Sequence, residues 1–151
     1  MRHLIYLGTM LALLLTFASV ETVQADRLPG SDQGGRPLTA ILLGPNEVPP
    51  APSSSQGTAA ITINLGQSEL CYVIDFTTSE TVIAAHIHHA PVGVAAPPVI
   101  PLNPPVAGSS SGCKQVDQGL LKDIVQNPEK YYVNVHTTAH PGGAGRGQLT
   151  K

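Results

Sequence analysis

Hydrophobic and polar residues alternate along much of this chain from Leu38 onward, which is the period of a β-strand. The first such stretch places Leu38, Ala40 and Leu42 on one face. Residues typical of turns, mainly Gly, Pro, Ser and Asn, separate the alternating stretches. The pattern predicts strands that begin at Leu38 and continue at 58–65, 69–77, 81–88, 131–137 and 145–150, with a short edge strand at 98–102.

Three segments depart from this alternation. The prolines of residues 44–55 exclude a central strand, and residues 91–112 are expected to be mostly loop. Residues 116–126 have a helical period instead, with Asp117 as the N-cap and Asn127-Pro128 as the stop. The apolar face of this helix comprises Leu120, Leu121, Ile124 and Val125.

Short strands joined by loops, without repeating βα units, predict the fold class. We expect an all-β fold, an antiparallel sandwich or open barrel, with one short helix before the strand at 131–137. The chain contains no Trp and only 2 Phe, so the core is expected to be aliphatic.

The N-terminus has the three-part layout of a secretory signal. Arg2 and His3 form a short positive region, residues 4–20 are apolar, and Val23-Gln24-Ala25 precedes a cleavage point before Asp26. A transmembrane anchor is the alternative, but it needs about 20 apolar residues, and polar residues and Gly interrupt this run. We expect a signal peptide at 1–25, a flexible leader at 26–37 and one domain at 38–151, secreted or periplasmic and without a membrane span after cleavage.

Charge and cysteine content narrow the function classes further. The formal net charge is −2 and charged residues make up 12% of the chain, so nothing favours nucleic acid or an anionic membrane. In an exported chain, the pair Cys71 and Cys113 most simply forms one disulfide. Metal-binding thiolates are the alternative, although neither cysteine has a second one two to four residues away.

Two histidine motifs are the strongest candidates for chemistry. In the first, strand alternation places His86 and His88 on one face and turns Ile83, Ala85 and Ile87 towards the core. In the second, the polar face carries Asn134, His136 and Thr138, and the core face carries Val133, Val135 and Thr137.

If these two strands are neighbours, His86, His88 and His136 form a three-imidazole set suited to a transition metal such as copper. His89 or His140 is then a candidate fourth ligand. Two other interpretations stay open: each ring clamps nearby loop backbone through its nitrogens, or the histidines are plain polar surface.

The remaining polar candidates favour structure over catalysis. Glu47, in its Pro-rich loop, is expected to accept hydrogen bonds from backbone amides and hold the turn together with Asn46. The serines of residues 53–55 and 109–111 lack the strand–turn–helix context of a hydrolase nucleophile, and no glycine-rich loop has the setting for phosphate binding. The sequence supports neither a hydrolase nor a nucleotide enzyme.

The motifs taken in order resemble the CHRD (chordin-type) domain. Its opening resembles residues 42–50 (LLGPNEVPP), and its middle resembles Gly57-Thr58-Ala59, Leu70-Cys71-Tyr72-Val73 and the AAHIH block at 84–88. The C-terminal motif of the domain resembles residues 131–149 (YYVNVHTTAHPGGAGRGQL). The resemblance implies a β-sandwich, in the single-domain exported form found in bacteria, and we expect it to be a Greek-key sandwich of superoxide-dismutase-like or immunoglobulin-like type. We also expect structural, loop-holding roles for Asn46, Glu47, Asn134 and Arg146.

The chain departs from this pattern at two places. It has His89 where the family usually has Gly, and Ala144-Gly145 before Arg146 where the family usually has an acidic residue. A more distant, architectural likeness to copper/zinc superoxide dismutase implies copper ligands at His86, His88 and His136 and an anion-guiding role for Arg146. A zinc site is not expected, because residues 91–112 contain no His, Asp or Glu.

Two functions follow from these patterns. The first is a non-catalytic binding or structural module with an unidentified protein or glycan partner. The second is a copper-binding, and in that case redox-capable, protein that uses the histidine set. Fold similarity alone does not decide between them.

Overall fold

The computed structural model describes residues 35–151. The predicted signal peptide and residues 26–34 of the predicted leader lie outside the described residues. Strand β1 (Arg36–Leu43) begins two residues before the predicted start at Leu38 and so includes the last two residues of the predicted leader. The other strands are β2 (Gln56–Asn64), β3 (Glu69–Thr77), β4 (Val82–His89), β5 (Pro98–Leu102), β6 (Ser109–Gln115), β7 (Tyr131–Thr137) and β8 (Gly145–Gln148).

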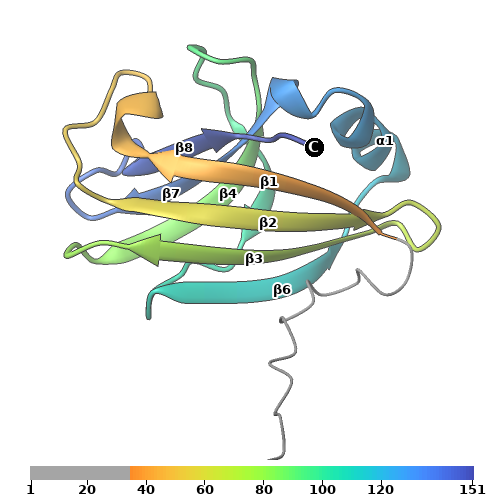
Figure 1. The fold of residues 1–151 in the computed structure, drawn as a ribbon, viewed down its shortest axis with the longest axis horizontal. Coiled ribbons are helices and arrows are strands. Elements are labelled where there is room, and N and C mark those ends of the chain that lie inside the picture. Colours follow the sequence, from red (N-terminus) through yellow and green to blue (C-terminus); the bar gives the residue numbers. More distant parts are fainter. Residues whose placement is uncertain (1–34) are drawn as a thin grey trace, which may run out of the picture.

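Eight antiparallel strands form one continuous sheet in the order β5-β4-β7-β8-β1-β2-β3-β6. The sheet folds over so that β1, β2, β3 and β6 form one layer, with β4, β7 and β8 behind it (Figure 1). The all-β class and the antiparallel sandwich are therefore confirmed, as is the single helix before β7. Within residues 35–151, no helix has the length and hydrophobicity of a membrane span.

The core lies between the two layers and follows the predicted alternation. In β1, Leu38, Ala40 and Leu42 are buried. Helix α1 (Gln118–Gln126) closes one end of the sandwich with Leu121 and Ile124, and Asp117 caps it by accepting a hydrogen bond from the Leu120 amide. Short 3₁₀ turns follow β1 (η2, Gly44–Asn46) and α1 (η3, Pro128–Lys130).

The two layers join where β8 meets β1. Leu43 pairs with Arg146, and an isolated bridge joins Thr39 and Thr150 beyond the end of β8. Gly147 permits this approach, because a Cβ added there would lie 2.3 Å from the Ile41 carbonyl oxygen. The last strand is shorter than the predicted 145–150, since Thr150 contributes only that bridge.

Two predictions about the strands were wrong. Ile83 is 48% exposed and Val82 faces the core, because the β4–β7 register shifts between Val82 and Ala84. Residues 109–112, expected to belong mostly to a loop, are part of the edge strand β6, which continues to Gln115. This strand has no hydrophobic alternation to reveal it, and it is held by main-chain pairing with β3 and by the disulfide.

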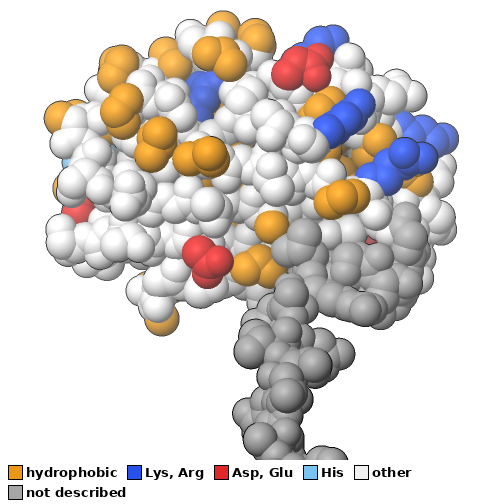
Figure 2. Space-filling view, viewed as in Figure 1, with side chains coloured by type: hydrophobic (Ala, Val, Ile, Leu, Met, Phe, Trp, Pro, Cys, Tyr) orange, Lys and Arg blue, Asp and Glu red, His pale blue; other side chains and the backbone are white. Residues whose placement is uncertain are grey.

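The surface carries few charges, as the composition indicates. In Figure 2, hydrophobic side chains gather over the Pro-rich loop after β1, whereas Lys and Arg gather on the side of α1. The loop after β4 contributes exposed Val92 and Val94. The two loops together line an open pocket of about 460 Å³, with Glu47, Arg146 and Gln148 among its lining residues.

Candidate functional site

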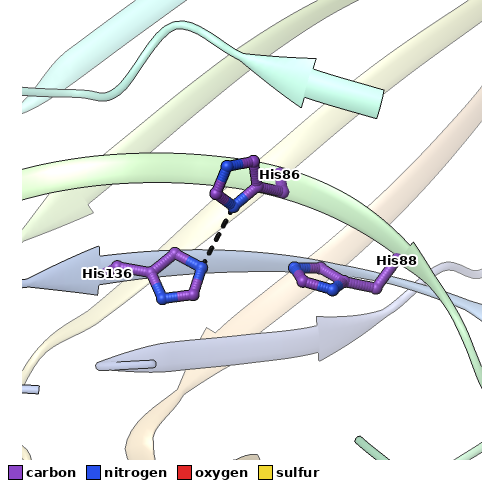
Figure 3. Close-up of side chains that lie close together, drawn as sticks. All are labelled: His86, His88 and His136. Atoms are coloured by element: carbon purple, nitrogen blue, oxygen red, sulfur yellow. Dashed lines mark hydrogen bonds between the residues drawn. The ribbon is translucent and has the colours of Figure 1, made fainter. Parts of the chain in front are cut away.

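The antiparallel pairing of β4 with β7 brings His86, His88 and His136 together on the outer face of the sheet (Figure 3). His86 Nδ1 lies 3.1 Å from His136 Nε2. One ring nitrogen from each histidine lies within 4.8 Å of the other two. Two ligands about 2.0–2.1 Å from one tetrahedral ion lie about 3.3 Å apart. The His86–His136 pair already has that spacing, so a small closing movement of His88 would complete a three-nitrogen site.

Backbone carbonyls orient two of the three rings. His88 Nδ1 lies 2.8 Å from the Ala96 carbonyl oxygen, and His136 Nδ1 lies 2.9 Å from the Pro141 carbonyl oxygen. Because a carbonyl oxygen can only accept, each Nδ1 must carry the proton, and each neutral ring keeps a lone pair on Nε2. This is the outer arrangement usual for metal-binding histidines.

The Nε2 atom of His88 is buried and has no hydrogen-bond partner among the described residues. His136 Nε2 accepts from His86 Nδ1, which assigns the proton of His86 to that nitrogen. Binding of a metal at His86 Nδ1 therefore requires the proton of that ring to move to Nε2. The lone pair of His88 Nε2 is thus free, whereas the lone pair of His136 Nε2 accepts one hydrogen bond, from His86.

Burial keeps all three rings in the neutral form that binds metals. Desolvation lowers the pKa of His86, and the neighbouring His136 lowers it further. The pKa values of His88 and His136 are also lowered, mainly by desolvation, although their carbonyl hydrogen bonds oppose the shift. At neutral pH no proton has to be displaced from a charged imidazole before a metal can bind.

The loop of residues 90–97, which hydrogen bonds from β8 hold in place, covers His88. Arg146 donates to the Val94 and Pro91 carbonyls at 2.9 and 3.0 Å. Gln148 donates to the Ala90 carbonyl at 2.7 Å. These hydrogen bonds hold the segment whose Ala96 carbonyl orients His88, so β8 positions His88 of β4 through the loop.

Tyr132 contacts both His88 and Arg146. Its ring stacks on His88 at 4.6 Å, and the Arg146 guanidinium lies 3.4 Å from its centroid. Arg146 is 2% exposed and is bound to loop carbonyls, which does not fit the anion-guiding role implied by the dismutase likeness. The guanidinium holds the loop instead.

Glu47 has a different partner from the one predicted. Among the described residues, its carboxylate accepts from the side-chain amide of Asn134, at 3.0 and 2.9 Å, and not from backbone amides of its own loop. Burial raises the Glu47 pKa to about 7, although nearby Arg146 opposes the shift. Asn46 donates to the Arg146 carbonyl at 3.1 Å and so ties the same loop to β8.

We expect Glu47→Gln to flatten the pH dependence of stability between about pH 4.5 and 7. The pKa of Glu47 rises from 4.5 to about 7 on folding, so its contribution to the free energy of unfolding falls as pH rises through this window. Across this pH window, the difference in free energy of unfolding between wild type and variant should change by on the order of 2 kcal/mol, allowing for partial solvent screening. Urea denaturation from pH 4 to 8 measures it.

Exposed Glu129→Gln is the control for losing one carboxyl group. Both variants keep every histidine, so histidine titration cancels in the comparison. Parallel stability curves for wild type and Glu47→Gln would contradict the raised pKa of Glu47.

Neither candidate for a fourth ligand joins the histidine set. His89 points to the opposite side of β4, where its ring stacks on Tyr131 at 4.5 Å. His140 lies beyond the end of β7, with its Nδ1 3.0 Å from Glu80 Oε2. Thr137 donates to the same carboxylate oxygen, so Glu80 ties the end of β7 to the segment before β4.

The two cysteines form the disulfide expected from an even pair in an exported chain. Cys71 in β3 lies directly opposite Cys113 in β6, and their sulfurs are bonded at 2.07 Å. Described residues therefore contain no free thiol for metal binding.

Several residues that shape the site were missed by the sequence analysis. Tyr132 and Gln148 hold His88 and its loop, and Glu80 binds His140. The alternation of β7 does place Tyr132 on the same face as Asn134 and His136, so this signal was available. Nothing local indicates that Gln148 reaches the loop after β4.

Comparison with known families identifies the chain. The family model of the CHRD domain matches residues 38–149. Comparisons with curated proteins and with solved structures find no match. The family match runs from β1 to the end of β8, includes all three clustered histidines, and confirms the resemblance drawn from the motifs. The chain belongs to the CHRD domain family.

Proposed function

We propose that this protein is an exported module that binds copper through His86, His88 and His136. The CHRD family match supports a binding or structural module, and the disulfide fits an extracellular location. Export rests on the signal-like residues 1–25, with the segment between residue 25 and β1 as a leader and the sandwich as the working domain.

The observation that carries the proposal is the unpartnered Nε2 of buried His88. A buried polar atom normally has a hydrogen-bond partner, and one without a partner needs an explanation. Here the atom carries a lone pair, and His88 contributes one ring nitrogen to the cluster with His86 and His136. A cation that accepts three lone pairs at once would satisfy all of them.

The donor set favours copper among the metals. Imidazole nitrogen suits zinc, copper, iron and nickel, whereas calcium and magnesium prefer oxygen. Affinity of such a site for divalent ions peaks at copper in the Irving–Williams order. Three neutral imidazoles do not neutralise the charge of the bound ion, as a carboxylate ligand would. The site is therefore compatible with both Cu(I) and Cu(II).

A structural role for the histidines is the second candidate. The carbonyl bonds of His88 and His136 would then serve only to hold their loops, and the protein would act through a protein or glycan partner. These bonds are equally present in a metal-binding histidine, so they do not separate the two functions. The unpartnered Nε2 favours the metal.

Calorimetric titration of the purified, tag-free protein with Cu(II), Cu(I) and Zn(II) tests the proposal. We expect one copper per chain, with micromolar or tighter affinity. His88→Ala and His136→Ala should weaken binding at least about 100-fold, since loss of even an outer partner costs about 10–100-fold.

His89→Ala is the matched control, because this neighbouring histidine lies on the opposite side of the same strand. It should leave copper affinity unchanged. If the folded wild-type protein binds no copper, or if His88→Ala binds as well as wild type, the metal function is wrong. A large loss of thermal stability in metal-free His88→Ala, without copper binding by wild type, would favour the structural role.

A further inference from the structure

Asn134 lies within the histidine set but is not one of its ligands. It is directly opposite His86 in the β4–β7 pairing and two residues before His136, on the same face of the sheet. Its side chain is 3% exposed. Cross-strand neighbours of this kind have Cβ atoms about 4.5–5.5 Å apart, so the side chains of Asn134 and His86 are neighbours on this face.

Glu47 determines which way the Asn134 amide points. Both oxygens of Glu47 accept from Asn134 Nδ2, and in the ionised form of Glu47, which only accepts, this places the nitrogen end of the amide towards the loop after β1. The hydrogen bonds to Glu47 therefore distinguish Oδ1 from Nδ2 of Asn134. The shape of the amide group alone does not distinguish them. The carbonyl end, Oδ1, therefore points away from Glu47.

That Oδ1 atom is buried and has no hydrogen-bond partner among the described residues. The outer face of β4 and β7 thus holds two unpartnered buried acceptors, Asn134 Oδ1 and His88 Nε2. A metal ion would satisfy the imidazole nitrogen. The amide oxygen instead suits a hydrogen-bond donor, such as a water molecule or another small ligand with an O–H or N–H group.

We infer that Asn134 holds an exchangeable water, or a similar small donor ligand, at an open position of the copper site. The inference rests on the proposed copper function. Three protein ligands leave a fourth position for an outside molecule, whereas closed structural sites supply four. Asn134 is a positioning residue that selects a ligand carrying a proton, and Glu47 keeps its amide in the required orientation.

Azide competition in the Cu(II)-loaded protein tests this role. Azide has no proton to donate to Asn134 Oδ1, whereas water does. Removing the amide should therefore favour azide over water by about 2- to 10-fold, which is what one hydrogen bond contributes. We expect Asn134→Ala to lower the azide dissociation constant by that factor, with copper affinity changed less than about threefold. Wild type should show strongly coupled exchangeable protons in pulsed EPR, in addition to the weaker exchangeable couplings of the imidazole N–H groups of His88 and His136.

Asn134→Ala alone leaves the Glu47 carboxylate buried without its partner, so the double variant Glu47→Ala/Asn134→Ala is measured as well. Removing both partners avoids an unsatisfied buried group. Asn103→Ala is the control, because this asparagine contacts Ser110 and Ser111 of β6 and not the histidines. It should bind azide as wild type does.

Each other outcome overturns the inference in a recognisable way. Equal azide affinity in wild type and both Asn134 variants means that Asn134 does not hold the outside ligand. Loss of copper affinity of about 100-fold in Asn134→Ala would make Asn134 a metal ligand instead. Absence of strongly coupled exchangeable protons beyond those of the imidazole N–H groups in wild type excludes the water. Failure of wild type to bind copper at all removes the proposed function and this inference together.

Discussion

Replacing Arg146 with Met is expected to lower the free energy of unfolding by about 3–5 kcal/mol, because two hydrogen bonds from a charged donor to loop carbonyls are lost, at about 1.5–3 kcal/mol each. The guanidinium is 2% exposed, donates to two carbonyls of the loop after β4 and stacks on Tyr132. The substitution also removes the positive charge that opposes the raised pKa of Glu47. Urea denaturation at pH 7 measures the change.

The same substitution should loosen residues 90–97 selectively. Hydrogen exchange of the amides in this loop is expected to become faster in Arg146→Met, whereas amides of β2 and β3 should keep their relative protection. Copper affinity should fall about 10- to 100-fold, because the loop supplies the carbonyl that orients His88.

Arg146→Lys is the informative comparison. A lysine keeps the charge but cannot donate in a planar fork to two carbonyls while stacking on an aromatic ring. We expect it to recover little of the lost stability. A lysine variant as stable as wild type would show that charge alone, rather than the fork geometry, holds the loop.

Removing the disulfide by Cys71→Ser/Cys113→Ser is expected to cost about 3–4 kcal/mol, from the chain entropy of a loop of this length. The two cysteines are 42 residues apart. None of the residues of β6 is buried, so this edge strand adds little apolar area to the core. Its position depends on pairing with β3 and on the covalent link.

Urea denaturation of the double variant and of wild type, each with and without a dithiol reductant, measures this effect. Reductant should destabilise wild type towards the value of the variant and leave the variant unchanged. Hydrogen exchange should accelerate in β6 more than in β2, which lies inside the sheet. Equal stability of variant and wild type would mean that pairing alone holds the edge.

Local sequence pattern was sufficient for most strands and for the helix. The bounds of β3, β5 and β7 agree with the predicted ranges, because alternation and flanking turn residues are properties of neighbouring positions. Alternation also placed His86, His88 and His136 on polar faces. The failure at β6 has the same cause, since Ser109–Gln115 has no apolar alternation and becomes a strand only beside β3.

The site itself depended on contacts between distant parts of the chain. Only the pairing of β4 with β7 brings the three histidines together, and a register shift that no local signal marks turns Ile83 outward. Glu47 meets Asn134 across 87 positions, and Arg146 meets Val94 across 52.

The sequence by itself therefore determined the elements other than β6, most of their inward and outward faces and the resemblance to the CHRD family. The tertiary structure decided which polar residues share one environment, why His88 and Asn134 each keep a buried unpartnered atom, and why His89 and His140 stand apart. The physical reason is that the period of a strand is local, whereas strand order, register and loop cover are set by how the whole chain buries its apolar surface.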